Sequence, residues 1–381
     1  MKQNVDYGPS IRFLCLALST RASADDIRTQ LPTSEVEWQH VLRLANQHLL
    51  APALYLSLRN NGLLESIDAK LAGFLKEVYV HNATRNEQLL KQMQEVAELL
   101  NHQGIQPVLL KGVGALVEGL FGDIGSRGML DIDILVAEDE VHRAYESLIA
   151  AGFYSTYENQ SEASQHLPRL FQKNMPAGLE LHDKLQHEMF AQTLSTSSVI
   201  AQSRPCQPWG DQGAIVRLMC PEHQIIHNFL HSQVGHSNHD HFRLDLRQMF
   251  HFSALALKYK HDLDWMAVEA AMETSGHQHK YAIYQASVAS LFEDSQASTK
   301  NDSRYLNVAI QMIGKRLPFW VLVKLEITAL KRAFSPSHIR MRFGAKNSFE
   351  VISFALKHLF HLVKKNINPN KIKARLMKYN R

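Results

Sequence analysis

The spacing of hydrophobic residues changes twice along the chain. Over residues 10–104 the apolar positions recur with a period near 3.6, which is typical of amphipathic helices. Ser34 followed by Glu37 matches the capping box that opens a helix. Short apolar strands and helices alternate over residues 105–215, and helical periodicity returns from Pro221 onward. The pattern predicts an α+β protein in which a small mixed sheet is flanked by helical regions at both ends.

These changes divide the chain into four expected segments. A helical region comes first, then the small α/β core, then helices that complete a cleft, and finally a basic helical tail. In chain order the expected boundaries are 1–104, 105–215, 216–316 and 317–381. A chain of 381 residues is long enough for two or three domains of ordinary size.

The expected core contains three strands. The first lies in IQPVLLKG and turns at Gly112 into a short helix. The second lies in LDIDILVAE, and the third surrounds Leu179–Leu181. An amphipathic helix between the second and third strands ends at Gly152.

Two aspartates interrupt the second strand. Asp131 and Asp133 are two positions apart, so in a strand they project from one face, about 6.6 Å apart. Ile132 and Ile134 then pack on the opposite face. Burying carboxylates is costly unless they are paired or bind a metal ion. Two carboxylates at this spacing can bind one divalent cation or bridge two, and magnesium prefers oxygen ligands.

The residues before the aspartates supply groups that bind phosphate. Lys111 and Gly112 lie where the first strand turns into a helix, whose free backbone N–H groups favour anions. Arg127 lies four residues before Asp131 and offers a guanidinium that can bind phosphate oxygens in pairs. The combination predicts a site for a metal ion and a nucleotide. The alternative is a solvated strand edge, which the apolar residues after the aspartates disfavour.

These motifs resemble those of the DNA polymerase beta-like nucleotidyltransferase superfamily, and more closely a bacterial family of uncharacterised nucleotidyltransferases. That family has an LKG turn followed by R-x-x-x-D-x-D-x-L-V. The matching residues here are Leu110, Lys111, Gly112, Arg127, Asp131, Asp133, Leu135 and Val136. The resemblance covers roughly residues 30–275 and does not extend to the segment from Lys324 to the end.

The resemblance implies a third carboxylate on a later strand. Glu180 is the best position, as a metal ligand or as the base for the attacking hydroxyl, and Asp183 is the fallback. The alternative for Glu180 is an ordinary carboxylate at a strand edge. His182 is expected to orient Glu180 or to contact substrate, and its alternative is a structural histidine. The implied catalytic and metal-binding residues are Asp131, Asp133 and Glu180, and the implied NTP-binding residues are Lys111, Gly112, Ser126 and Arg127.

The implied activity is transfer of a nucleoside monophosphate from an NTP, such as ATP, to a hydroxyl or phosphate of an acceptor, with release of pyrophosphate. The implied cofactor is magnesium or manganese. The acceptor is RNA, a protein or a small molecule. Two alternatives stay open: an enzyme of surface-polysaccharide synthesis at the membrane, and a non-catalytic nucleotide-binding or regulatory protein on the same fold.

Three positions depart from the family pattern. Gly128 stands where proline is usual, Leu130 where a small residue is usual, and His251 where an aspartate is common. None of them is an expected metal ligand, so the departures bear on substrate preference and do not exclude activity.

Two histidine-containing patterns suggest other chemistry. His223, His227 and His231 recur every four residues and therefore share one face of an expected helix. A metal site is one interpretation, but there is no HExxH motif, and a mixed polar helix face is the favoured one. The segment Arg247–His251 is one residue short of the Arg-x4–6-His signature of a helical ribonuclease class, so we disfavour that function.

The net charge of +4 hides an asymmetry. From Lys324 to Arg381 there are 14 Lys and Arg against 2 Asp and Glu, a net of +12, which leaves −8 on the remaining 323 residues. A basic tail of this kind predicts an anionic partner such as RNA or a membrane surface. The alternative is a docked helix with a solvated basic end.

No apolar run approaches the roughly 20 residues that a membrane span needs, and the run Phe13–Leu18 is too short for the core of a signal peptide. Three widely spaced cysteines without a CxxC pair argue against a disulfide framework and fit a reducing compartment. We expect a cytoplasmic protein without a transmembrane segment, with peripheral membrane association through the tail as the alternative.

Overall fold

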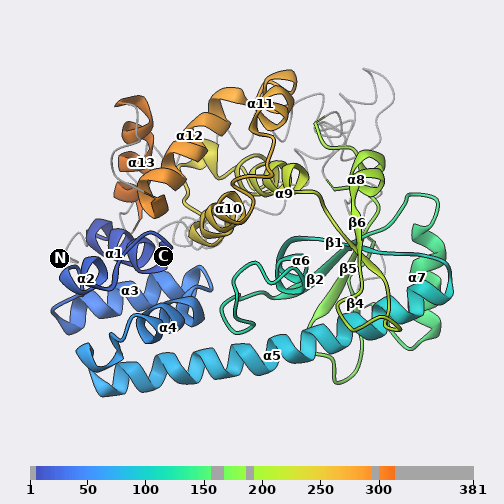
Figure 1. The fold of residues 1–381 in the computed structure, drawn as a ribbon, viewed down its shortest axis with the longest axis horizontal. Coiled ribbons are helices and arrows are strands. Elements are labelled where there is room, and N and C mark those ends of the chain that lie inside the picture. Colours follow the sequence, from blue (N-terminus) through green and yellow to red (C-terminus); the bar gives the residue numbers. More distant parts are fainter. Residues whose placement is uncertain (1–5, 156–166, 186–192, 294–299, 314–381) are drawn as a thin grey trace, which may run out of the picture.

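The computed structural model describes residues 6–155, 167–185, 193–293 and 300–313. Within these ranges, helices surround one seven-stranded mixed sheet, which confirms the expected α+β class (Figure 1). The basic tail expected from Lys324 onward lies outside the described residues. None of the helices in the described ranges combines the length and the hydrophobicity needed to span a bilayer.

The elements follow the expected order of helices, sheet segment and helices. The α-helices are α1 (Gly8–Leu18), α2 (Ala24–Thr29), α3 (Glu35–Gln47), α4 (Ala51–Asn60), α5 (Ala69–His102), α6 (Lys111–Val117), α7 (Val141–Ala150), α8 (Thr196–Gln202), α9 (Pro221–Phe229), α10 (Leu246–Lys258), α11 (Trp265–Thr274), α12 (Gln278–Val288) and α13 (Lys300–Met312). The strands are β1 (Val108–Leu109), β2 (Asp131–Leu135), β3 (Tyr154–Ser155), β4 (Leu170–Phe171), β5 (Gly178–His182), β6 (Arg204–Cys206) and β7 (Val216–Leu218). Short 3₁₀ or π turns are η1 (Leu64–Ser66), η3 (Leu230–Gly235), η4 (His239–His241) and η5 (Ala289–Glu293).

The strand that carries the two aspartates lies in the middle of the sheet. The strand order is β3-β4-β5-β2-β1-β7-β6. β2 runs parallel to β5 and antiparallel to β1. One face of β2 is fully buried through Ile132 and Ile134, as the alternation predicted, and packs in a core with α5 and α7. The opposite face therefore carries the aspartates.

Helix α5 joins the N-terminal helices to the sheet. Its 34 residues span about 51 Å at 1.5 Å per residue, and Figure 1 shows it running from the N-terminal helices to the sheet. Asp68 caps its start by accepting a hydrogen bond from the backbone N–H of Lys70 at 2.9 Å. The first half packs against α4, and buried residues of the second half, Leu89, Met93 and Val96 among them, pack with the sheet.

The first and the last described helices share one hydrophobic core. Buried residues of α1 and α4, such as Ile11 and Leu54, belong to the same cluster as Phe229, Tyr281 and Ile310 of the later helices. The expected segments 1–104 and 216–316 therefore pack together, although the sheet separates them in the sequence; the boundaries themselves stay a prediction.

Helix α3 begins and ends with recognisable caps. The Ser34–Glu37 capping box is confirmed: the Ser34 hydroxyl accepts from the Glu37 N–H at 3.3 Å, and the Glu37 carboxylate accepts from the Ser34 N–H at 3.1 Å. At the other end, the Leu50 N–H donates to the Ala45 carbonyl at 2.7 Å, as in a Schellman turn. Leu49 takes the left-handed position of that turn, φ 55°, which glycine usually occupies.

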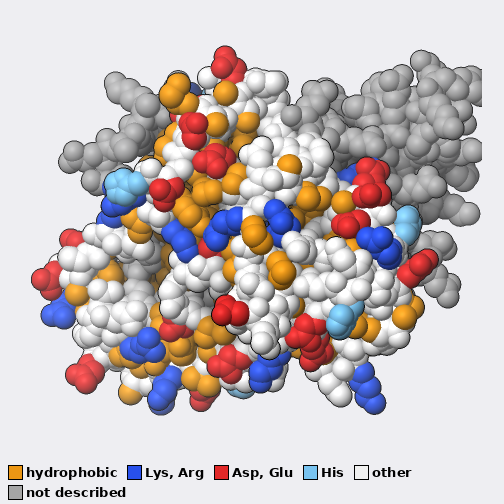
Figure 2. Space-filling view, turned by 45° about the vertical axis from the view of Figure 1, so that its right-hand side comes forward, with side chains coloured by type: hydrophobic (Ala, Val, Ile, Leu, Met, Phe, Trp, Pro, Cys, Tyr) orange, Lys and Arg blue, Asp and Glu red, His pale blue; other side chains and the backbone are white. Residues whose placement is uncertain are grey.

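Acidic and basic side chains are interspersed on the face shown in Figure 2, where several Lys and Arg side chains lie near the middle. The charge on this face is therefore mixed, in contrast to the strongly basic sequence of the tail.

Candidate active site

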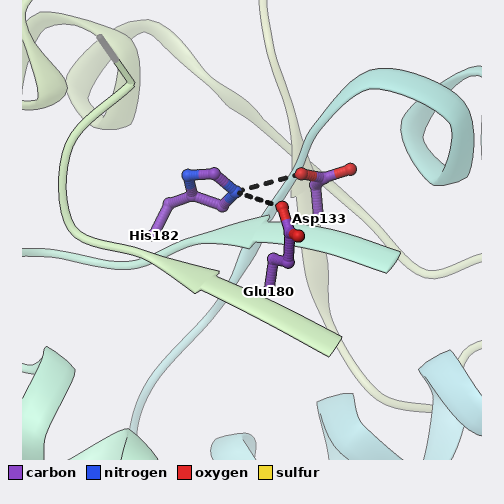
Figure 3. A group of neighbouring side chains, drawn as sticks. All are labelled: Asp133, Glu180 and His182. Carbon is purple, nitrogen blue, oxygen red and sulfur yellow. Dashed lines mark hydrogen bonds and ion pairs between the residues drawn. The ribbon is translucent and has the colours of Figure 1, made fainter. Parts of the chain in front are cut away.

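The pairing of β2 with β5 gathers the predicted acidic residues. The two strands are parallel, with Asp133 opposite Glu180 and Leu135 opposite His182. Because neighbouring strands in register present paired residues on one face, the side chains of Asp133, Glu180 and His182 converge (Figure 3). One donor atom from each residue lies within 4.8 Å of the others.

Asp133 is almost fully buried and contacts two groups that can carry positive charge. Its Oδ1 accepts from Lys111 Nζ at 2.5 Å and lies 3.0 Å from His182 Nε2. Burial would raise the pKa of Asp133, but the charge of Lys111 and the hydrogen bond from His182 hold it well below its usual range. Burial disfavours protonated His182, yet hydrogen bonds to Asp133 and Glu180 outweigh it and raise the His182 pKa. Asp133 is therefore ionised, with His182 donating to it.

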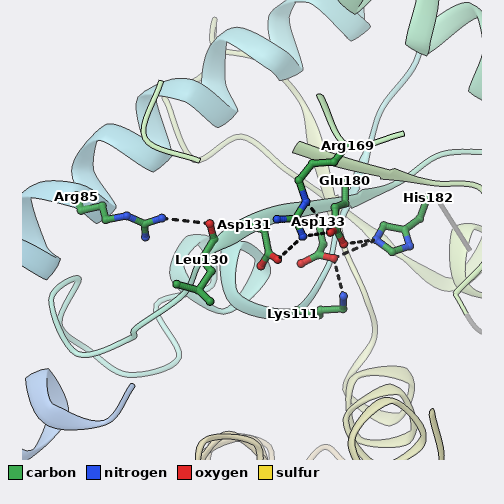
Figure 4. Close-up of polar contacts among 8 residues, drawn as sticks. All are labelled: Arg85, Lys111, Leu130, Asp131, Asp133, Arg169, Glu180 and His182. Carbon is green, nitrogen blue, oxygen red and sulfur yellow. Dashed lines mark hydrogen bonds and ion pairs between the residues drawn. The ribbon is translucent and has the colours of Figure 1, made fainter. Parts of the chain in front are cut away.

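Arg169 bridges the other two carboxylates (Figure 4). Its guanidinium contacts Asp131 Oδ2 at 3.1 Å and donates from Nε to Glu180 Oε1 at 2.9 Å. Gly178, opposite Asp131 on β5, makes room for it, since a Cβ there would be 2.7 Å from Arg169 Cδ. The pKa of Asp131 is raised by burial and then by the negative charges of Asp133 and Glu180. The three carboxylates thus face two permanent cations, Lys111 and Arg169, and the imidazole of His182, whose pKa is raised.

This donor set fits a divalent metal ion. Two carboxylates and one imidazole converge, with Asp131 on the same face of the sheet, and hard cations such as magnesium and manganese prefer carboxylate oxygens. In the described part of the chain, Asp133, Glu180 and His182 form the only group of three or more potential ligands whose donor atoms converge this closely. Arg169 contacts two of the same carboxylates, so a bound ion and Arg169 would compete for them.

Helix α5 fixes the loop that leads into β2. The side-chain amides of Asn82 and Asn86 donate to the Arg127 carbonyl at 3.0 and 2.8 Å. Arg85 donates to the Met129 carbonyl and also to the Leu130 carbonyl, the contact drawn in Figure 4. Sequence reasoning missed this role, although polar residues at 82, 85 and 86 share one face of a helix and were a usable signal.

The expected phosphate-binding residues differ in where the structure places them. Lys111 begins α6, with φ 48°, and contacts the carboxylate cluster. Gly112 lies in the first turn of that helix and packs against Met129, whose Sδ would be 2.7 Å from a Cβ at 112. Ser126 is buried, and its hydroxyl donates to the Asp123 carbonyl at 2.8 Å.

Arg127 is only 4% exposed, and its guanidinium carbon lies 5.9 Å from the centre of the Phe121 ring. Burial, followed by the charge of Arg247, lowers the pKa of Arg127 to about 9. Asp183 is one residue beyond β5, and its carbonyl accepts a hydrogen bond from the Thr196 hydroxyl at 3.0 Å. The catalytic and binding roles of all these residues stay predictions.

The positions that depart from the family pattern have distinct surroundings. Gly128 lies against Leu49, whose carbonyl oxygen would be 2.6 Å from a Cβ at 128. Leu130 is 63% exposed beside Asp131. His251 on α10 is buried, and neither of its ring nitrogens has a hydrogen-bond partner in the described ranges.

The model of the family described as uncharacterised nucleotidyltransferase matches residues 34–293. The chain belongs to this family. The matched region of the chain begins at the cap of α3 and contains the carboxylate cluster, Lys111 and all of α5. The family expected from the sequence motifs is thereby confirmed. A comparison with curated proteins gave no match.

Proposed function

We propose that the protein transfers a nucleoside monophosphate from an NTP to a hydroxyl or phosphate of an acceptor and releases pyrophosphate. One observation carries this proposal: the in-register pairing of β2 and β5 brings Asp131, Asp133 and Glu180 to one face of the sheet. Membership of a nucleotidyltransferase family supports the same reaction.

Each charged residue has a role in the proposed reaction. Asp131, Asp133 and Glu180 would hold a magnesium or manganese ion, which would neutralise phosphate charge and favour ionisation of the acceptor. Lys111, already in contact with Asp133, adds positive charge beside the phosphates. His182 donates to Asp133 and keeps that carboxylate ionised and oriented.

Glu180 is the proposed proton acceptor for the attacking hydroxyl. It is 8% exposed and pairs with Arg169. An ion pair lowers the basicity of a carboxylate, so proton acceptance requires Glu180 to part from Arg169 when substrate binds. Most of the rate enhancement in such a site comes from positioning and from charge stabilisation.

A non-catalytic, nucleotide-binding role on the same fold is the competing proposal. The contacts of Asp133 with Lys111 and His182, and of Asp131 and Glu180 with Arg169, favour catalysis, because a scaffold has no need for a charged cluster that is costly to bury.

The test is incubation of purified protein with each α-labelled NTP, magnesium and total cell extract, beside the Asp131→Asn/Asp133→Asn double variant. Label that moves into RNA, protein or a small molecule with the wild type alone would support the proposal and name the acceptor class. Equal labelling by the double variant would contradict it. Absence of transfer together with absence of magnesium-dependent NTP binding would favour the scaffold role.

A further inference from the structure

A cleft of about 590 Å³ lies between the end of α3, the loop before β2 and the start of α10. Pockets of this volume hold small ligands in many proteins. The lining residues that matter here are His48, Leu49, Leu130, Phe242, Arg243 and Arg247. Leu130 directly precedes Asp131, the first residue of β2. The cleft therefore reaches the start of that strand, although none of the clustered carboxylates lines it.

Arg247 is the notable charge in this cleft. It is half-buried in the first turn of α10, and it makes no hydrogen bond or ion pair with any residue that the structure describes. By contrast, Arg85 and Arg169 beside the site both have partners. The acid in the lining, Asp245, caps α10 by accepting from the Gln248 N–H at 3.2 Å. A half-buried guanidinium without a partner is unfavourable unless an anion binds there.

The positive charge of Arg247 lies close to a second, buried guanidinium, that of Arg127. The pKa of Arg127 is lowered first by burial and then by the charge of Arg247. A bound anion would relieve this repulsion.

The wall of the cleft also offers apolar surface. Leu130 is 63% exposed and Phe242 is 37% exposed, and both line the cleft. Leu49 and Phe242 hold left-handed backbone conformations, φ 55° and 51°, which non-glycine residues rarely adopt. Gly128 allows the loop before β2 to approach Leu49. The cleft thus pairs a cationic end with an exposed apolar wall, as a phosphate ester of an organic molecule requires.

We propose that this cleft binds a phosphate-bearing substrate, with Arg247 contacting phosphate oxygens and with Leu130 and Phe242 against the organic part. The claim that the bound molecule is a substrate rests on the proposed function. The claim that the cleft binds phosphate does not depend on it. The phosphate belongs either to the NTP or to a phosphorylated acceptor, and the experiment separates these two sources.

The first measurement is calorimetric titration of the full-length protein with inorganic pyrophosphate in the presence of a chelator. We expect Arg247→Gln to weaken binding about 10- to 100-fold, the effect of losing a charge-assisted hydrogen bond. The matched control is Arg28→Gln, which removes the same charge from an exposed position on α2 and should leave binding unchanged. Equal affinity of wild type and Arg247→Gln, or no binding of pyrophosphate by the wild type, would overturn the proposal.

Arg247→Lys serves if Arg247→Gln does not fold, and it should retain part of the affinity because the charge remains. A second titration uses a non-hydrolysable ATP analogue with magnesium. Weaker binding of the analogue by the Arg247 variant assigns the cleft to the triphosphate of the NTP, whereas unchanged binding assigns it to the acceptor.

The Asp131→Asn/Asp133→Asn double variant separates this inference from the proposed function. It should still bind pyrophosphate without metal, because its substitutions lie outside the cleft lining. If pyrophosphate binding depends on Arg247 but the wild-type protein shows no nucleotidyl transfer, the proposed function is refuted and the phosphate site is supported. Transfer without Arg247-dependent binding would refute the phosphate site alone.

Discussion

The carboxylate cluster of β2 and β5 and the histidine-rich face of α9 and η3 look alike in sequence. Each repeats a titratable residue at a spacing that keeps it on one face, every second residue in the strand and every fourth in the helix. In the structure the acids contact cations: Asp133 pairs with Lys111, and Asp131 pairs with Arg169. The pKa of His227, by contrast, falls to about 3, through burial and then the charge of Lys111.

The difference has a simple physical origin. A carboxylate stays ionised in a protein only with compensating charge, so buried acids accumulate cations around them and remain ready for a metal ion. An imidazole that is buried without acidic partners, such as His227, becomes neutral and packs as an ordinary core side chain, whereas His182, which contacts Asp133, keeps a raised pKa. Regular spacing therefore identifies a shared face, and the charge that surrounds the face decides whether it can do chemistry.

The largest expected effect is on the rate of transfer, and it distinguishes the carboxylate cluster from the histidine-rich face. Asp133→Asn should lower nucleotidyl transfer about 1,000-fold, because it removes a metal ligand and the partner of Lys111. His227→Gln, a core change of similar size, should alter the rate by less than about threefold. Rates of label transfer measure both, with circular dichroism to establish folding. A larger loss in the histidine variant would reverse the assignment.

Glu180→Gln should slow transfer about 100-fold, the usual contribution of a general base. Asp183→Asn is its control, since Asp183 lies beyond the end of β5, and it should leave the rate nearly unchanged. The rate and its pH profile are measured for both variants. A loss in Asp183→Asn alone would transfer the role of third carboxylate to that residue.

Arg169→Met should raise the affinity for manganese about tenfold in the nucleotide-free protein, because the guanidinium no longer competes for Asp131 and Glu180. The control is Arg143→Met, which breaks only a surface pair with Glu140. Manganese binding is followed by electron paramagnetic resonance. Weaker binding in Arg169→Met would mean that the arginine organises the ligands rather than competing with the ion.

The smallest expected effect concerns stability and pH. His227 has a pKa of about 3 when folded and about 6.5 when unfolded, so the unfolded chain binds an extra proton between these values. Its contribution to stability is complete above pH 6.5 and is lost as the pH falls. Between pH 6.5 and 5.5 this loss is about 1 kcal/mol. Urea unfolding at both pH values measures the loss of unfolding free energy on acidification. That loss should be smaller in His227→Gln than in the wild type by about the same amount; an equal loss in the two proteins would exclude His227 as its origin.

The sequence predicts the local parts of the site and misses the parts that depend on tertiary contacts. The spacing of Asp131 and Asp133 predicts a shared face, and the family motif points to Glu180; the register of β2 with β5 unites them. Arg169 could not be found this way, because only the antiparallel pairing of β4 with β5 brings it to the carboxylates. The cleft that contains Arg247 is equally hidden, since its walls come from segments roughly 200 residues apart.

In the fold, too, features that depend on neighbours in sequence are predicted and features that depend on distant contacts are missed. Helix caps such as Ser34–Glu37 depend on neighbours in sequence and are predicted correctly. The shared core of the first and last helices depends on contacts between distant segments, which hydrophobic periodicity does not report.

The most direct test of the central claim, that Asp131, Asp133 and Glu180 catalyse nucleotidyl transfer, is a pair of reactions with the same NTP labelled at the α- or the γ-phosphate. The account predicts that the α-label moves to the acceptor, that the γ-label leaves in pyrophosphate, and that the Asp131→Asn/Asp133→Asn variant does neither. Movement of the γ-label to the acceptor, or transfer of the α-label by the double variant, would contradict it.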